Sequence, residues 1–430
     1  MGFPERIERE LRPGVKLLYS QTRDFKSALF RVVFAVPLEK ETASGYSLLT
    51  NMLSLTTAEY PDIRSFAVAK DELYALWLDS YVKRSQETLL VTLEFESLAD
   101  SFALEGEKLL EKAVKMLGGA IFTPNAPGGV FPKKLLDGEK RSLIGEIESI
   151  IENDSDFAFM RSLEIMCAGE PYATDAAGDK KLVKKLDGKT LYDVYYKYCL
   201  ENAPVFISYV GEADIGEVAE YVEKYLPFAP RTGKIPECTV HRAGGFRRVR
   251  EKTRSDECTV VIGASYAPCK TLRERVALAL FDEIFGGASG RLFINVREKE
   301  GLCYFCSTVS PGVKNVYFII CGTEPANARR AEEAIRREFD LAANGLCSGG
   351  ELDTAKKTLL RRVDNTGASP ASISSNLIAQ ALAAPEERAG PEELRAIIRS
   401  VTAQEIAAIT KTMQTELVYT LEDPIEGKKR

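Results

Sequence analysis

The sequence predicts an α+β protein of two homologous domains, each an antiparallel-rich β-sheet covered by helices. The chain has 430 residues, whereas single hydrophobic cores stop growing at about 250–300 residues. The order of predicted strands and helices in the first half occurs again in the second half. A proline- and glycine-rich segment, residues 227–236, separates the halves. We therefore expect an N-terminal domain over residues 1–227, a linker over 228–244 and a C-terminal domain over 245–430.

The first half begins with strands, continues with helices and a hairpin, and closes with a strand and a helix. Alternating apolar residues predict strands, and apolar residues spaced by three and four predict helices. The predicted strands are 15–19, 29–36, 75–82, 88–95 and 205–210. The predicted helices are 44–55, 63–73, 101–117, 132–152 and 215–225. The polar turn at residues 83–87 predicts a hairpin between the third and fourth strands.

The second half repeats this order from residue 246 onward. Its predicted strands are 247–251, 258–266, 303–310 and 315–322. Its predicted helices are 272–285, 290–300, 326–343 and 351–363. The repeat is about 200 residues long, which is too long for a solenoid, so the pattern indicates duplication of a whole domain.

Composition excludes several classes of protein. A formal net charge of −6 and a pI of about 5.4 give no electrostatic basis for binding nucleic acid. No apolar run approaches the roughly 20 residues that cross a bilayer, and the start of the sequence has no apolar signal core. We therefore expect a cytoplasmic protein. Its nine cysteines are an odd number, with none before Cys167, which favours reduced thiols over a disulfide framework.

The chain has a single histidine, His241, just beyond the proline- and glycine-rich segment 227–236. Any mechanism that needs two imidazoles, as zinc ligands or as an acid and base, therefore cannot be built on this chain. We expect His241 to be a solvated loop residue. The alternative is a metal-independent cysteine hydrolase, which requires a thiol beside the His241 imidazole.

A family resemblance comes from one stretch of the second half. That stretch reads Gly286-Gly287-Ala288-Ser289-Gly290-Arg291-Leu292-Phe293, followed by Val296-Arg297-Glu298-Lys299-Glu300-Gly301-Leu302-Cys303-Tyr304. It closely resembles the C-terminal domain signature of the pitrilysin or insulinase family, the inverted zincins that include the mitochondrial processing peptidases. The resemblance implies a clamshell whose two domains enclose a chamber. It also implies that Arg297 and Tyr304 contact the substrate backbone, since guanidinium and phenol groups can donate hydrogen bonds to a peptide carbonyl.

The sequence departs from the family at the metal motif. Active members carry H-x-x-E-H on an early helix, which supplies two zinc ligands and the base. The equivalent positions here are Ser47, Thr50 and Asn51. Glu139 and Glu146 match the family's second acid and distal zinc-ligating glutamate, seven residues apart on one helical stripe. Without histidines we interpret both as vestigial acids, and we expect no metal, no cofactor and no peptidase activity on this chain alone.

Two further patterns have simpler interpretations. The glycine-rich run 286–290 follows a helix and lacks the Gly-Lys-Ser/Thr ending of a nucleotide loop, so we expect a flexible connector between helices. Cys303 and Cys306 form a C-x-x-C, but an i,i+3 pair on a strand points to opposite faces. We therefore expect two unrelated buried thiols. Ser348 and Glu351, which match the family's late helix start, also form a capping box.

The resemblance implies a bacterial, non-catalytic subunit that binds substrate within a heterodimeric zinc metalloendopeptidase. The partner would be a homologous subunit carrying H-x-x-E-H and the zinc, and the substrate a peptide or unfolded segment. Bacterial members of this branch associated with aminopentanol modification of elongation factor P make that modification a candidate role. The alternative is a peptide-binding or scaffold protein with no proteolytic activity, which an adjacent gene for an H-x-x-E-H homologue would argue against.

Overall fold

The computed structural model describes residues 6–252, 256–310, 313–344 and 347–422. The first five residues, on which part of the expectation of a missing signal core rests, lie outside these ranges. The chain divides into two compact units. Unit 1 comprises Met1–Ile147, Thr174–Glu237 and Asn365–Ala384, and unit 2 comprises Glu148–Ala173, Cys238–Asp364 and Pro385–Arg430. Each unit contains one sheet and several helices, so the predicted α+β class is confirmed.

The sheet of unit 1 has the strand order β1-β2-β6-β3-β5-β4. Its strands are β1 Arg6–Arg12, β2 Val15–Gln21, β3 Ser27–Pro37, β4 Trp77–Ser85, β5 Thr88–Leu98 and β6 Val205–Gly211. The pair β2 and β6 is parallel, and the other neighbours are antiparallel. The central strand β3 is buried almost throughout, as expected for a strand covered on both faces.

The sheet of unit 2 has the order β7-β11-β8-β10-β9. Its strands are β7 Arg247–Lys252, β8 Cys258–Ser265, β9 Phe305–Val309, β10 Val316–Thr323 and β11 Gln414–Glu422. The pair β7 and β11 is parallel, while β8, β9, β10 and β11 pair in antiparallel fashion.

The two sheets share one topology. When β7, β8, β9, β10 and β11 are set against β2, β3, β4, β5 and β6, the five-stranded orders are identical and the parallel pair falls at the same place. Only β1 has no counterpart among the described strands. The duplication predicted from the order of elements is therefore confirmed by strand order.

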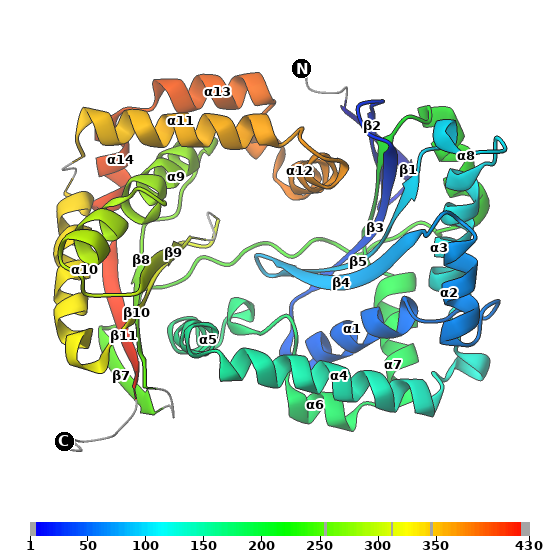
Figure 1. Cartoon of the computed structure of the whole chain (residues 1–430), viewed down its shortest axis with the longest axis horizontal. Coiled ribbons are helices and arrows are strands. Elements are labelled where there is room, and N and C mark those ends of the chain that lie inside the picture. Colours follow the sequence, from blue (N-terminus) through cyan, green and yellow to red (C-terminus); the bar gives the residue numbers. More distant parts are fainter. Residues whose placement is uncertain (1–5, 253–255, 311–312, 345–346, 423–430) are drawn as a thin grey trace. The chain divides into compact units, whose positions relative to one another are not determined.

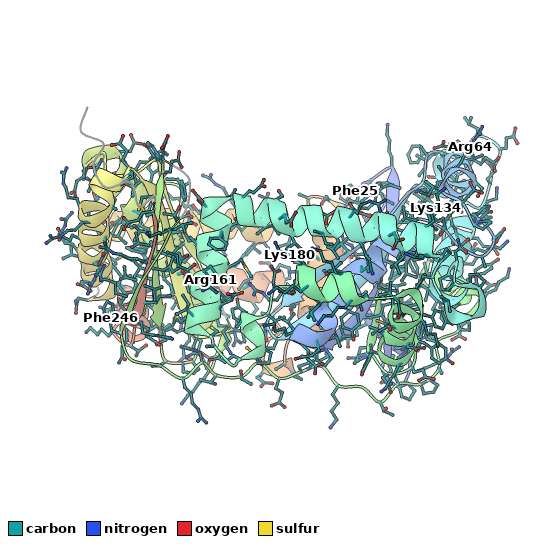
Figure 2. All side chains as sticks on the ribbon, turned by 90° about the horizontal axis from the view of Figure 1, so that it is seen from below. Phe25, Arg64, Lys134, Arg161, Lys180 and Phe246 are labelled. Carbon is teal, nitrogen blue, oxygen red and sulfur yellow. The ribbon has the colours of Figure 1, made fainter. Side chains whose placement is uncertain are left out.

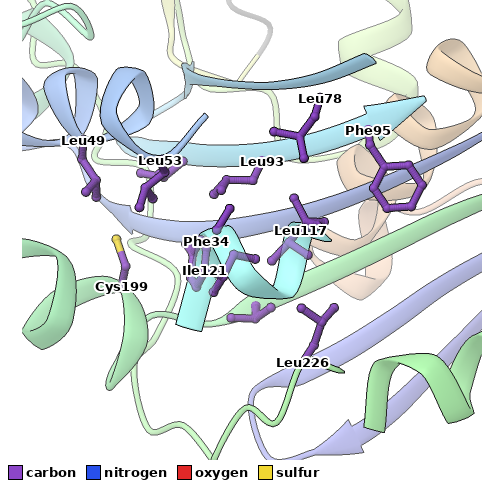
Figure 3. Packing of buried hydrophobic residues seen from close by; sticks show 14 of the residues in the cluster. Phe34, Leu49, Leu53, Leu78, Leu93, Phe95, Leu117, Ile121, Cys199 and Leu226 are labelled. Atoms are coloured by element: carbon purple, nitrogen blue, oxygen red, sulfur yellow. The ribbon is translucent and has the colours of Figure 1, made fainter. Parts of the chain in front are cut away.

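The helices of unit 1 cover its sheet and form a large core. They are α1 Lys40–Leu53, α2 Ile63–Asp71, α3 Leu109–Phe122, α4 Lys133–Glu152, α6 Lys180–Lys185, α7 Gly188–Val194, α8 Ile215–Tyr225 and α12 Pro370–Leu382, with a π-helix η4 at Tyr195–Leu200. Short 3-10 turns are η1 Asp100–Phe102 and η2 Pro127–Gly129. Figure 3 shows part of the core, where Leu49 and Leu53 of α1 and Ile121 of α3 lie among Phe34 and Leu93 of the sheet.

The helices of unit 2 are α5 Asp154–Met166, α9 Leu272–Gly286, α10 Ala328–Ala343, α11 Gly349–Asn365, α13 Pro391–Ser400 and α14 Ala403–Thr410. A π-helix, η5 Leu292–Lys299, follows α9, and 3-10 turns are η3 Pro171–Ala173, η6 Pro325–Asn327 and η7 Pro385–Glu387. Phe281 and Phe285 of α9 pack with Tyr317 of β10 and Phe339 of α10 in an aromatic cluster. This cluster joins two helices to the sheet.

Each sheet is completed by a helix from the other half of the sequence. In unit 1, Ile373, Leu377, Ile378 and Ala381 of α12 pack on apolar residues of the sheet, and α12 is seen beside the strands of this sheet (Figure 1). In unit 2, Ala158, Leu163 and Met166 of α5 pack on the sheet formed by β8, β10 and β11. The expected domains, 1–227 and 245–430, are continuous, whereas the compact units exchange these two helices.

The exchanged helix α5 is also tied to its sheet by charge. Arg161, labelled in Figure 2, donates from Nη2 to Glu251 Oε1 of β7 at 2.7 Å. Tyr419 of β11 donates to the other oxygen of Glu251 at 3.0 Å. Together these bonds lower the pKa of Glu251, with Arg161 as the main cause.

The segment between the halves has no helix or strand from residue 226 to 246. It is nevertheless anchored within each unit. Phe228 is buried in the core of unit 1, and the buried Arg231 donates to the carbonyl of Cys199 at 2.6 Å. Asn315 of unit 2 accepts from the backbone N–H of His241 at 2.8 Å and donates to its carbonyl at 3.0 Å.

Several predicted elements differ from those observed. The helix predicted from residue 101 begins at Leu109, because Gly106 has φ +69° in a turn and Asp100 accepts from the N–H of Leu110 at 2.9 Å. The helix predicted at 290–300 is the π-helix η5. The elements β1, α5, α6, α7, α12, α13, α14 and β11 were not predicted. In the described part of the chain, no helix is long and apolar enough to cross a bilayer.

Candidate functional site

The positions of the degenerate metal motif lie on α1 with their hydroxyls bonded to backbone. Ser47 is buried and donates to the carbonyl of Ala176 at 2.8 Å. Thr50 is buried and donates to the carbonyl of Ser47, one turn earlier, at 2.8 Å. Both hydroxyl protons are therefore used within unit 1, which is the usual arrangement for buried polar groups.

The remaining motif position faces the helix that carries the two acids. Asn51 is half-buried on α1 and makes a side-chain hydrogen bond with Glu139 of α4, and Glu146 lies close enough for its charge to act on Glu139. Burial raises the pKa of Glu139, the charge of Glu146 adds to the rise, and the bond from Asn51 opposes it. The structure thus brings Asn51, Glu139 and Glu146 together and directs Ser47 and Thr50 to backbone.

Zinc does not fit this set of donors. Zinc sites in proteins are built from thiolate, imidazole and carboxylate ligands, whereas α1 offers two bonded hydroxyls and an amide. Glu139 and Glu146 would be the only ionisable donors, and Glu139 is already an acceptor for Asn51. The donors on α1 and α4 therefore do not support metal-dependent catalysis.

Arg297 and Tyr304 lie on one segment of unit 2 and are both exposed. Arg297 belongs to η5, has a side chain 43% exposed, and lies over the ring of Phe293 at 5.0 Å. Gly301, with φ +61°, turns the chain after η5. Tyr304 follows, 50% exposed, with its backbone N–H bonded to the carbonyl of Gly322 at 2.9 Å. Since π-helical turns often occur at functional sites, this segment stays the predicted site of substrate contact.

The polar atoms of this pair are only loosely engaged. Arg297 lies 3.8 Å from a carboxylate oxygen of its neighbour Glu298. Tyr304 donates to Glu324 at 3.3 Å. Partial burial and the charge of Glu324 raise the pKa of Tyr304. Tyr304 is therefore a neutral hydrogen-bond donor at neutral pH, and Arg297 a cationic one.

The prediction of two unrelated buried thiols at Cys303 and Cys306 is wrong. Cys303 lies before β9, so the strand alternation on which the prediction rested does not apply to it. Cys306 and Cys321 are cross-strand partners. Hydrogen bonds from the thiols of Cys306 and Cys321, aided by the charge of Arg297, hold the pKa of Cys303 well below its usual value. Three thiols therefore interact beside the predicted substrate-contact segment.

The glycine-rich run 286–290 connects α9 to η5, as expected, but it is a tightly packed turn. A side chain at Gly286 would meet Thr308 of β9 at 2.1 Å, and one at Gly287 would meet the carbonyl of Glu283 at 2.3 Å. The N–H of Gly290 bonds to the carbonyl of Gly287 at 2.8 Å. Gly286 is therefore required by the close approach of the Thr308 side chain, and Gly287 by that of a backbone carbonyl.

The prediction of a solvated His241 is also wrong. The residue is 4% exposed, and its Nδ1 lies 2.6 Å from Glu170 Oε1 and its Nε2 3.4 Å from Glu416 Oε2. Cys167 belongs to the same cluster. No sequence pattern indicates this cluster, because the two glutamates are 71 and 175 residues away from His241 in the chain.

The fold and the α1 and α4 positions define a class: a two-domain, zinc-peptidase-like protein without the zinc ligand set. A family model described as "Peptidase M16 inactive domain" matches residues 186–359. A Bacillus subtilis (strain 168) protein named "Probable inactive metalloprotease YmfF" is 25% identical over 403 residues, covering 93% of this chain and 94% of the relative.

Solved structures agree at the level of fold. A conserved protein from Enterococcus faecalis V583 has a TM-score of 0.89 at 23% identity, covering 98% of this chain and 100% of that one. A peptidase M16 inactive domain from Pseudomonas fluorescens has a TM-score of 0.80 at 18% identity, covering 99% of each chain. The family model and the Bacillus relative support an inactive member of the M16 peptidase family, in agreement with the pitrilysin and insulinase resemblance of the sequence.

Proposed function

We propose that this chain is the non-catalytic, substrate-binding subunit of a heterodimeric zinc-peptidase complex. Its partner is a homologous subunit that carries H-x-x-E-H and the zinc, and its substrate is a peptide or an unfolded segment. The observation that carries the proposal is a contrast within the chain. The metal-motif hydroxyls of Ser47 and Thr50 are buried and bonded to backbone, whereas Arg297 and Tyr304 remain exposed on unit 2.

The chemistry of Arg297 and Tyr304 suits an extended peptide. A peptide backbone offers carbonyl acceptors, and a cationic guanidinium and a neutral phenol are both donors. A hydrogen bond to a charged group contributes about 1.5–3 kcal/mol, which is enough to orient a substrate segment. Because these donors produce no nucleophile, they assist catalysis only where another subunit supplies the base and the metal.

The test is complementation. We would measure cleavage of an unstructured fluorogenic peptide by this chain, by an H-x-x-E-H homologue from the same organism, and by their equimolar mixture, and follow complex formation by size-exclusion chromatography. We expect activity in the mixture that exceeds the sum of the separate rates, together with a heterodimer peak. A mixture that forms no complex and adds no activity would overturn the proposal.

The same experiment separates the alternative of a peptide-binding or scaffold protein. Peptide binding by this chain, measured by fluorescence anisotropy with no gain in cleavage on mixing, would favour that alternative. Association with modification of elongation factor P stays a prediction from the family resemblance. The cytoplasmic location stays a prediction from the sequence pattern. A pull-down with purified elongation factor P would test the former.

A further inference from the structure

A second group of metal-ligating side chains lies within unit 2. Cys167 Sγ, a carboxylate oxygen of Glu170 and an imidazole nitrogen of His241 all lie within 4.8 Å of one another. Among the described residues it is the one group of three or more such donors that approach this closely. Thiolate, carboxylate and imidazole together are the ligand types of zinc.

The chain builds this group from two fixed segments. Cys167 ends α5, and Glu170 follows in a turn in which its N–H bonds to the carbonyl of Cys167 at 2.9 Å. His241 is held by its backbone, which makes two hydrogen bonds with the buried side chain of Asn315. The backbone of His241 is therefore held independently of its ring nitrogens.

The two ring nitrogens of His241 have different neighbours. Nδ1 lies 2.6 Å from Glu170 Oε1, and Nε2 lies 3.4 Å from Glu416 Oε2 on β11. Metal-bound histidines usually donate the N–H of the second nitrogen to a carboxylate, which fixes the ring. Here Nδ1, beside Glu170, is the nitrogen that would bind the metal. Nε2 faces Glu416, which is the supporting carboxylate.

Carboxylates lie on both sides of the His241 imidazole, and basic side chains lie around the group. Glu170 Oε2 is paired with Lys314 Nζ at 2.5 Å, and this ammonium also donates to the carbonyl of Thr239 at 2.7 Å. Arg242 and Arg247 line the surface hollow beside Glu170 and His241. A carboxylate that binds and a second one that supports the imidazole are the arrangement found at zinc sites.

One buried acceptor near the group also lacks a partner. Glu416 is 2% exposed, and its Oε2 accepts from the N–H of Gly244 at 2.7 Å. Its Oε1 is buried without a hydrogen-bond donor among the described residues. Such atoms are uncommon in folded proteins and often mark an ion or water position.

A metal ion has a route from solvent to the group of Cys167, Glu170 and His241. A surface hollow of about 480 Å³ is lined by residues that include Glu170, His241 and Gly244. The side chain of Glu170 is 21% exposed, whereas that of His241 is 2% exposed. A metal ion can therefore reach the group from solvent through Glu170, although a peptide substrate cannot reach the buried Cys167.

We propose that Cys167, Glu170 and His241 bind one zinc ion, with Glu416 supporting the imidazole. Zinc–ligand bonds of roughly 2.0–2.3 Å set ligand atoms about 3.3–3.6 Å apart, so Glu170 must shift by under about 1 Å from His241. The ion would hold the end of α5 against the segment that contains His241, which is a structural role. The site differs from the family's catalytic site and departs from the expectation that the chain holds no metal.

The test is zinc binding by the full chain alone, after treatment with a chelator and in competition with a chromophoric zinc indicator. We expect one tight site per chain and a thermal unfolding midpoint raised by zinc. Cys167→Ser and Glu170→Gln should each weaken zinc binding by about 10- to 100-fold. Cys303→Ser, in the thiol group beside η5, is the matched control and should bind as the wild type does.

A second readout identifies the thiolate directly. With cobalt(II) in place of zinc, the wild type and Cys303→Ser should show a sulfur-to-cobalt charge-transfer band that Cys167→Ser lacks. Near-ultraviolet circular dichroism of each variant confirms that it is folded. The proposal is overturned if the folded wild type takes up no zinc, or if binding is lost in Cys303→Ser and kept in Cys167→Ser.

Discussion

At the scale of single residues, the polar groups of α1 are engaged, whereas those of Arg297 and Tyr304 are exposed. Asn51 contacts Glu139, so the helix pair that would carry a metal site is still in register, but its donors are an amide and acids instead of imidazoles. Arg297 and Tyr304 are exposed and have only long contacts with carboxylates. The difference between an engaged and an available polar group is thus the basis of the functional proposal.

The thiol of Cys303 should be the most reactive in the protein at mildly acidic pH. Its pKa is lowered by hydrogen bonds from Cys306 and Cys321, then by Arg297, so the thiolate persists as the pH falls. Ordinary thiols, with a pKa of about 8.5, are protonated there and react slowly. We expect iodoacetamide at pH 6 to label Cys303 first, as measured by peptide mass spectrometry.

Two comparisons sharpen this prediction. Cys269 is the internal reference, because burial raises the pKa of its thiol to about 11. Cys306→Ala removes the leading hydrogen-bond donor and should slow the labelling of Cys303. Equal labelling rates for Cys303 and Cys269 at pH 6 would show that the thiolate is not stabilised.

At the scale of elements, long-range polar pairs fix edge strands and helices to each sheet. Arg248 of β7 donates to both oxygens of Glu332 on α10, at 2.6 and 2.7 Å. This two-bond pairing is the strong form of an arginine–carboxylate contact. It attaches the edge strand β7, whose side chains are otherwise largely exposed, to a helix of unit 2.

This pair predicts a pH-dependent contribution to stability. Arg248 lowers the pKa of Glu332 in the folded state, so the contribution is present above the unfolded pKa of about 4.3 and is lost as the pH falls through the folded value. Glu332→Gln should lower the free energy of unfolding by about 1–2 kcal/mol at pH 7. Urea unfolding at pH 7 and pH 3 should show the difference from wild type shrinking at the lower pH.

The neighbouring Glu333 supplies the matched control. It pairs with Arg329, whose side chain is 89% exposed, so Glu333→Gln should change stability by less than about 0.5 kcal/mol. An effect of Glu332→Gln that is the same at both pH values would contradict the ionic origin of the contribution.

The helix α12 packs in unit 1 although it comes from the second half of the sequence. We therefore expect the stability of unit 1 to depend on a residue of α12. Ile373 is 1% exposed among apolar residues of the sheet formed by β2, β3, β5 and β6. Ile373→Ala leaves a cavity and should destabilise the protein by about 2–4 kcal/mol. Leu104→Ala, at a site 86% exposed, should change stability by less than about 0.5 kcal/mol. Comparable unfolding midpoints for the two variants would show that α12 is not part of the core.

At the scale of the whole molecule, the sequence predicts the repeated unit well and the exchange between units not at all. Periodicity and turn residues locate most strands and the helix α8, because these signals are local. The pairing of α5 and α12 with sheets of the opposite half depends on contacts between distant segments. Such contacts leave no spacing pattern in one sequence. The exchange of α5 and α12 therefore could not be predicted, and the predicted domains were continuous.

The candidate sites divide in the same way. The α1 and α4 positions and the Arg297–Tyr304 segment are recognisable because each is a local motif of the family. The cluster of His241 with Cys167 and Glu170 joins residues from separate segments, and each looks unremarkable in its own stretch of sequence. Burial of His241, which decides its character, is a property of the folded unit.

We propose that Arg297 contributes to a substrate site whose metal and base belong to a partner subunit. The most direct test is kcat/KM for peptide cleavage by the mixture of this chain with its H-x-x-E-H homologue, comparing wild type, Arg297→Ala and the control Arg329→Ala. Loss of a hydrogen bond from a charged donor predicts a decrease of about 10- to 100-fold for Arg297→Ala, with Arg329→Ala unchanged. Equal kcat/KM for Arg297→Ala and wild type, in a mixture that is active, would contradict the claim.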